Sequence, residues 1–113
     1  MKTAVKKVTR QELHRRAYDL ALELFRLISC DAEAPEFELS VEIRKAAQDT
    51  VRHLSPDLDA EEALDAASDS AARLEYTLLL AWDLGLFRHV DLEDFRKMAA
   101  EIGAAARKMK SSR

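Results

Sequence analysis

Hydrophobic residues recur at spacings of three and four along four stretches of the chain, as in helices with one buried face. The first stretch follows Thr9-Arg10-Gln11-Glu12, which has the Ser/Thr-x-x-Glu form of a capping box, and it runs to about Cys30. The second ends before Ser55-Pro56, because proline lacks the backbone donor that a helix needs. The pattern therefore predicts helices over about 10–30 and 38–54.

Two further helices are predicted in the second half of the chain. One begins at Ser55-Pro56 or at Asp59-x-x-Glu62, since both are start signals, and it ends at Gly85, a natural left-handed cap. Asp91 is a suitable cap for the other. The predicted ranges are about 59–85 and 91–110. Four helices with short connections favour one all-α domain over 1–113, folded as an antiparallel up-down four-helix bundle.

Composition agrees with a folded helical domain. The 113 residues are 48% hydrophobic and 35% charged, which excludes the low hydrophobicity of a disordered chain, and only two glycines and two prolines are present. Cys30 is the only cysteine, so an intrachain disulfide is excluded, and we expect it to be a small buried side chain in a reducing compartment. The first 16 residues lack the apolar core of a secretory signal peptide, so we expect a cytoplasmic protein.

The segment SAARLEYTLLLAWDLGLF carries leucines nearly all round the predicted helix. Glu75 and Asp83 bracket only seven uncharged residues where a membrane span needs about 20, so the segment is expected to pack in protein and no membrane partner is expected. On a helical wheel Trp82 falls with the core leucines, whereas Leu80, Leu84 and Phe87 fall roughly opposite.

Two interpretations of this second apolar face remain open. The helix is either wedged between two neighbours, with long side chains covering its edges, or it buries Leu80, Leu84 and Phe87 against another subunit. We favour the second, because monomers rarely leave such a strip in water, and Tyr76 suits a seam between subunits. The predicted oligomer interface therefore contains Tyr76, Leu80, Leu84 and Phe87.

Three segments, RRAYDLALELFRLI, FELSVEIRKAA and SAARLEYTLLLAWDLGLF, carry a resemblance over nearly the whole chain. In this order and spacing they resemble the bacterial four-helix-bundle proteins encoded in intervening sequences of 23S ribosomal RNA genes. The resemblance extends to the accessory variability determinant proteins of diversity-generating retroelements, which assist a reverse transcriptase. It implies a homopentameric ring with a role in binding nucleic acid.

One turn departs from that family's pattern. After the segment that matches IRKAA, the family usually continues into an Asn-Ile-Ala-Glu-Gly turn and a longer linker with a basic residue. Here His53-Leu54-Ser55-Pro56-Asp57 stands in that place, followed by a shorter acidic run. The role of that turn is therefore not carried over, and Pro56 implies a stiffer entry to the third helix.

Charge is distributed unevenly along the chain. The net charge is -3, yet residues 1–16 carry +5 and residues 107–113 carry +4, so the middle carries -12. An up-down bundle brings both basic ends together, and the second predicted helix has a basic stripe away from its apolar face, so either patch is suited to phosphates of RNA or DNA. The candidate contacts are Lys6, Lys7, Arg10, Arg44, Lys45, Arg52, Arg107, Lys108 and Lys110. Two other interpretations stay open. Lysines and arginines at the ends of a chain often only make it more soluble, and the basic residues of the second predicted helix can instead pair with acidic neighbours.

Acidic residues on the third predicted helix raise an alternative. Glu62, Asp65 and Asp69 share one side at spacings of three and four, and such a side is either solvated or binds a basic protein partner. None of the three histidines has the glutamate three residues before it that a di-iron bundle needs, and no glycine-rich phosphate loop is present. We therefore expect no metal, no other cofactor and no catalytic residue.

Together these observations predict a non-enzymatic oligomeric accessory protein that contacts nucleic acid or a nucleic-acid enzyme such as a reverse transcriptase. The alternative is a protein-interaction scaffold that uses the acidic face of the third helix without binding nucleic acid. Salt-sensitive binding of RNA or DNA separates the two hypotheses.

Overall fold

The computed structural model describes residues 8–30, 38–58, 61–88 and 90–111, and these residues form helices and turns without any strand. The helices are α1 (Arg10–Cys30), α2 (Glu38–His53), α3 (Glu61–Asp83) and α4 (Leu92–Ser111). The all-α prediction with four helices is confirmed, with each observed helix end within two residues of its predicted position. The predicted start of the third helix at residue 59 lies outside the described residues.

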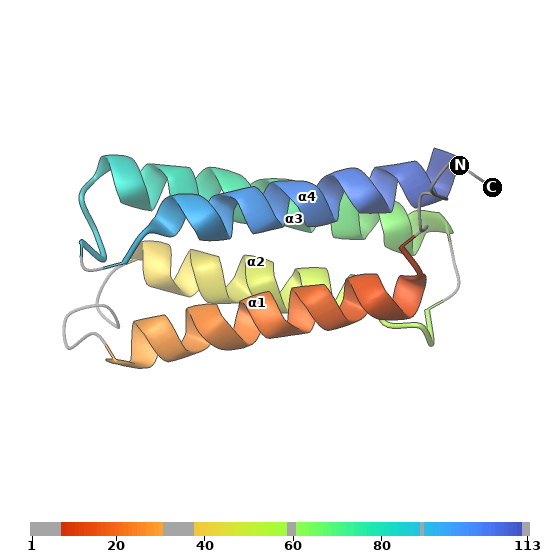
Figure 1. Cartoon of the computed structure of the whole chain (residues 1–113), viewed down its shortest axis with the longest axis horizontal. Coiled ribbons are helices and arrows are strands. Elements are labelled where there is room, and N and C mark those ends of the chain that lie inside the picture. The colour runs from red at the N-terminus through yellow and green to blue at the C-terminus, as the bar shows by residue number, and fades with distance from the viewer. Residues whose placement is uncertain (1–7, 31–37, 59–60, 89, 112–113) are drawn as a thin grey trace, which may run out of the picture.

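The four helices lie side by side along the longest axis of the molecule, and each runs back along the one before it (Figure 1). α1 contacts α2, and α3 packs most extensively on α4, while α2 with α3 and α1 with α4 join the two pairs. The α1–α4 contact is the least extensive of the four. The beginning of α1 and the end of α4 lie at the same end of the molecule.

Local capping explains where several helices begin and end. The Thr9 hydroxyl accepts a hydrogen bond from the Glu12 amide at 3.1 Å, and the Asp91 carboxylate accepts one from the Glu93 amide at 3.0 Å. Gly85 has a φ of 76°, and the amides of Gly85 and Leu86 reach back to α3 carbonyls at 3.0 Å. These two bonds form a Schellman motif, so the predicted caps at Thr9, Gly85 and Asp91 are confirmed.

Small residues set the close packing of α3 on α4. Ala67 and Ala71 of α3 and Ala99, Gly103 and Ala106 of α4 are all buried. A Cβ atom placed on Gly103 would lie only 3.3 Å from the Cβ of Ala71. The two backbones therefore approach closely, and larger leucine and isoleucine side chains fill the space toward α1 and α2.

Phe87 corrects one prediction. Its side chain is only 3% exposed and belongs to the core of the same chain, so it is not available to a second subunit. The wheel continued the phase of α3 to residue 87, but α3 ends at Asp83 and the chain reverses at Gly85. Beyond that reversal the 3.6-residue period no longer says where a side chain points.

Trp82 corrects a second prediction, because it is 45% exposed rather than part of the core. Its neighbours Leu78 and Ala81 are fully buried, so at this level of α3 the buried face includes those two side chains and leaves much of Trp82 in water.

Candidate functional site

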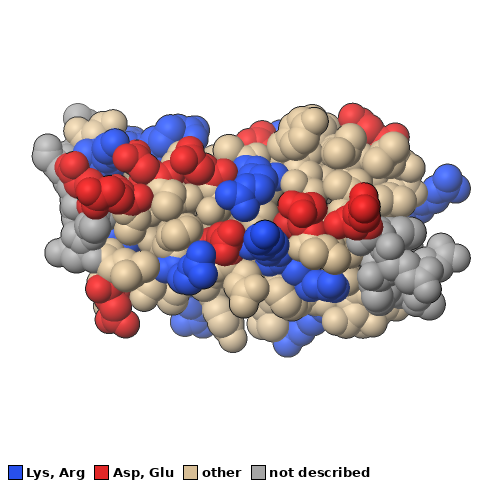
Figure 2. Space-filling model, turned by 180° about the vertical axis from the view of Figure 1, so that it is seen from behind, with Lys and Arg blue, Asp and Glu red and all other residues tan. Residues whose placement is uncertain are grey.

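Exposed apolar side chains lie on about the last two turns of α3 and on the residue after it, with the exposed Asp83 among them. We call this surface the apolar strip, and it consists of Tyr76 (65% exposed), Leu79 (41%), Leu80 (37%), Trp82 (45%) and Leu84 (61%). Figure 2 shows α2 and α3 from behind, with acidic side chains gathered toward one end of the upper half and uncharged surface toward the other. Large apolar side chains grouped in this way on one helix mark an interaction site.

The strip only partly matches the predicted interface. Tyr76, Leu80 and Leu84 are exposed as predicted, whereas Phe87 is buried. Sequence reasoning missed Leu79 and Trp82, which the wheel placed with or beside the core leucines. The signal that was available is the unbroken apolar run from Leu78 to Trp82, because a helix with one buried face cannot cover all of its sides.

Arg10 does not face a nucleic-acid partner as predicted, because its guanidinium turns toward the end of α2. It donates hydrogen bonds to the backbone carbonyls of His53 (3.1 Å), Leu54 (3.2 Å), Ser55 (3.4 Å) and Leu58 (2.6 Å). A guanidinium is a suitable cap for a helix C-terminus, because it carries several donors and its charge offsets the negative end of the helix dipole. Arg10 is therefore a structural residue. The other N-terminal candidates, Lys6 and Lys7, lie outside the described residues.

The basic end of α4 lies against the acidic first half of α3. Lys110 Nζ is 2.7 Å and 2.8 Å from the two carboxylate oxygens of Asp65, and Arg107 donates to the Ser68 hydroxyl at 3.0 Å. The hydrogen bond to Asp65, with the nearby charges of Glu61 and Glu62, raises the pKa of Lys110 above its ordinary value. Arg107 and Lys110 are thus engaged within the chain, and they partly neutralise the acidic face; Lys108 is exposed beside them.

The predicted basic stripe on α2 is retained on the surface. Lys45 and Arg52 are exposed and Arg44 is half-buried. Arg52 donates to Asp49 at 3.1 Å, and Arg73 of α3 lies 3.5 Å from the other oxygen of that carboxylate. Asp49 therefore offsets part of the positive charge of Arg52, while no ion pair within the described residues involves Arg44 or Lys45.

A second ion cluster joins α3 to α4. Arg96 donates to both carboxylate oxygens of Glu93 and, at 3.0 Å, to Glu75 of α3. The hydrogen bond from Arg96 lowers the pKa of Glu93 below its ordinary 4.5, and the two carboxylates raise the pKa of Arg96. This cluster links the second half of α3 to the first half of α4.

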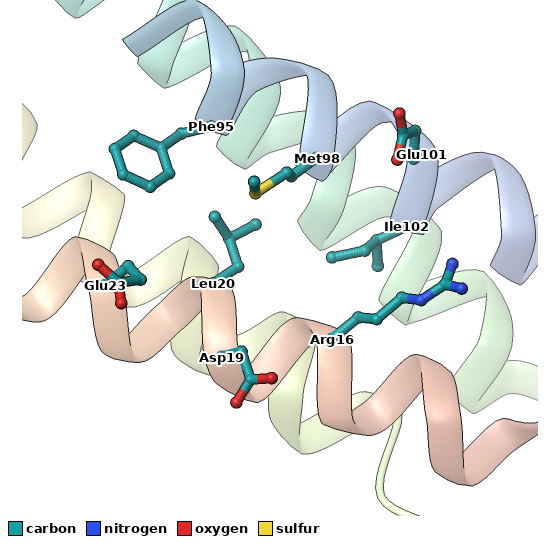
Figure 3. A pocket seen from close by; sticks show the side chains of 8 residues that line it. All are labelled: Arg16, Asp19, Leu20, Glu23, Phe95, Met98, Glu101 and Ile102. Carbon is teal, nitrogen blue, oxygen red and sulfur yellow. The ribbon is translucent and has the colours of Figure 1, made fainter. Parts of the chain in front are cut away.

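An open groove runs between α1 and α4, where the helices pack least closely. Its volume is about 540 Å³, and Figure 3 shows Leu20 of α1 reaching toward Met98 and Ile102 of α4. Met98 is 46% exposed, so part of the apolar floor faces solvent. The groove is lined by Arg16, Asp19, Leu20, Glu23, Phe95, Met98, Glu101 and Ile102. The sequence pattern did not indicate it, because periodicity gives each helix a buried face but not how closely two faces meet.

Cys30 is exposed at the end of α1, which corrects the expectation of a buried thiol. Within the described ranges, histidine, cysteine, aspartate and glutamate do not gather in any group of three suited to a metal ion. The described helices also include none with the length and hydropathy to cross a membrane.

Comparison with known proteins adds no assignment, since neither a protein-family model nor a curated protein nor a solved structure matches the chain.

Proposed function

We propose that this chain is a non-enzymatic accessory protein that self-associates through the apolar strip and contacts nucleic acid through the basic outer face of α2. The observation that carries the proposal is the strip, because a helix that buries one face and, with the residue after it, leaves five large apolar side chains in water is suited to contact protein. In this proposal each subunit is an antiparallel up-down four-helix bundle, and the subunits assemble into a ring.

The resemblance to the proteins of 23S ribosomal RNA intervening sequences supports the same proposal. It supplies the homopentamer and a nucleic acid, or an enzyme such as a reverse transcriptase, as the partner. Repetition around a ring multiplies a weak basic patch, so Arg44, Lys45 and Arg52 of several subunits would together contact more phosphates than one chain can. The basic chain ends contribute less than the sequence predicted, because Arg10, Arg107 and Lys110 have partners within the chain.

The test combines mass with nucleic-acid binding. Light scattering gives the mass of the purified chain, and RNA and DNA of mixed sequence are then titrated at two salt concentrations. We expect a multimer whose affinity falls steeply with salt and drops further in the double variant Arg44→Gln/Lys45→Gln. The double variant Arg15→Gln/Arg26→Gln is the matched control, because it removes the same charge from exposed positions of α1.

A multimer that binds neither RNA nor DNA would contradict the nucleic-acid role. It would favour the alternative of a protein-interaction scaffold that uses the exposed Glu61, Glu62 and Asp69 of α3. Equal losses in the two double variants would show that net charge matters and that the α2 stripe does not.

A further inference from the structure

One carboxylate lies between two arginines where α2 meets α3. Oδ1 of Asp49 is 3.1 Å from Nη2 of Arg52 on α2, and Oδ2 is 3.5 Å from Nη1 of Arg73 on α3. The Asp49 side chain is much less exposed than that of either arginine. Both guanidiniums therefore remain open to solvent although they share one carboxylate.

Arg73 extends the basic surface of α2 onto a second helix. It is the only basic residue between Glu61 and Asp83, and its contact with Asp49 places it beside the α2 stripe. Figure 2 shows basic side chains gathered across the middle of the face that α2 and α3 form, with acidic side chains among them. The period of α2 cannot indicate a residue of α3, so Arg73 was not among the residues predicted to contact nucleic acid.

The shared carboxylate leaves both arginines able to bind another anion. Two guanidiniums and one carboxylate retain one positive charge, and each guanidinium has five donors, more than a single carboxylate oxygen accepts. Exposed ion pairs contribute little to stability in water, whereas a guanidinium binds phosphate with two parallel hydrogen bonds. A phosphate held there would lie well within one Debye length of Asp49, which would repel it.

We infer that Arg73 is a phosphate contact of the nucleic-acid surface and that Asp49 lowers the affinity of this surface. The inference rests on the nucleic-acid role proposed above; it adds a residue of α3 to the site and gives an acidic residue an opposing effect. The ligand chemistry is the phosphodiester backbone that RNA and DNA share, so these contacts carry no base sequence information.

Two variants that each remove one charge test the inference. The purified chain is titrated with single-stranded RNA and with duplex DNA of mixed sequence at several salt concentrations. Arg73→Gln should reduce the slope of log affinity against log salt by about 0.9 for the duplex or about 0.7 for the single strand. Asp49→Asn should bind roughly three to five times more tightly at low salt, because it removes one charge a few Å from the phosphate.

The matched controls lie on α1, away from the boundary of α2 with α3. Arg15 and Asp19 form an exposed ion pair at 3.9 Å, and Asp19 lines the α1–α4 groove. Arg15→Gln and Asp19→Asn remove the same two charges, and each should keep the wild-type salt slope and affinity. Arg73→Lys keeps the charge and should restore the slope. Circular dichroism checks the fold of every variant, and a gain of affinity in Asp49→Asn cannot come from damage to the fold.

The outcomes separate this inference from the proposed function. If the wild type binds and Arg73→Gln keeps its salt slope, Arg73 is not a contact and the inference is wrong, while Arg44→Gln/Lys45→Gln still tests the role of α2. If Asp49→Asn gains no affinity, or if Asp19→Asn gains as much, the role assigned to Asp49 is wrong. A wild-type chain that binds neither RNA nor DNA would overturn the nucleic-acid role together with this inference.

Discussion

Among single residues, Arg10 makes the clearest prediction about stability. Its guanidinium donates to four carbonyls that follow or end α2, and these would lose a charged partner in Arg10→Ala. Hydrogen bonds to a charged group contribute about 1.5–3 kcal/mol, so we expect Arg10→Ala to lower the free energy of unfolding by about that amount. Urea denaturation followed by circular dichroism measures the change.

The control for Arg10 is Arg15→Ala on the same helix. Arg15 is exposed and lies 3.9 Å from Asp19, so its removal should change stability by less than about 0.5 kcal/mol. If instead Arg10→Ala unfolds at the wild-type urea concentration but binds nucleic acid more weakly, Arg10 contacts phosphate and the capping role is wrong.

At the residue scale, the features that the sequence predicted are those that depend on near neighbours. The caps at Thr9, Gly85 and Asp91 need only the backbone groups within a turn or so, and each was predicted from the residue type at one position. Arg10 bonds to carbonyls more than 40 residues away, and nothing in its own neighbourhood indicates them. Phe87 depends on where the chain goes after Gly85, which no helical period describes.

Within α4, the ion pair between Glu93 and Arg96 makes the first turns of this helix sensitive to acid. Arg96 lowers the pKa of Glu93 below 4.5, so this carboxylate stabilises the folded state above its unfolded pKa, and the stabilisation is lost as the pH falls through the folded pKa. Glu93→Gln should therefore melt at a lower temperature than wild type at pH 7, and the difference should shrink below pH 4.5. Melting curves between pH 7 and pH 2.5 measure it.

Asp94→Asn is the matched control for this prediction. Asp94 is exposed and stands beside Glu93 in the first turn of α4, so it shares the interaction with the helix dipole but makes no ion pair within the described residues. Equal pH-dependent differences for Glu93→Gln and Asp94→Asn would assign the effect to the dipole and contradict the role of Arg96.

At the scale of elements, periodicity predicted which residues of each helix are buried better than it predicted what covers the rest. The apolar spacing together with the cap and proline signals predicted the ends of the helices to within two residues. Trp82 was misplaced because the period of α3 alone does not say how much of its surface the neighbouring helices cover. The α1–α4 groove was missed because it depends on how closely two helices meet, which neither helix shows alone.

Across the whole molecule, folding brings together basic and acidic segments that are far apart along the chain. The basic C-terminal segment and the acidic first half of α3 are separate in sequence, yet Lys110 and Asp65 are ion-paired. The sequence offered each as a possible binding surface, and folding partly cancels both. What the fold leaves exposed is the α2 stripe and the apolar strip, and the proposed contact with another protein chain rests on the strip.

If the strip is buried between copies, the stability of the whole molecule depends on its concentration. Assembly removes folded monomer from the unfolding equilibrium, so a hundredfold rise in concentration should stabilise each chain by roughly 1–2 kcal/mol and raise Tm by roughly 5–10 °C. Leu80→Glu should melt at the same temperature at every concentration. Tyr18→Glu, which alters an exposed aromatic residue of α1 outside the strip, should follow the wild type. Scanning calorimetry at about 5 and 500 μM measures the Tm of the wild type and of each variant. A wild-type Tm that does not change over this range would contradict burial of the strip between copies.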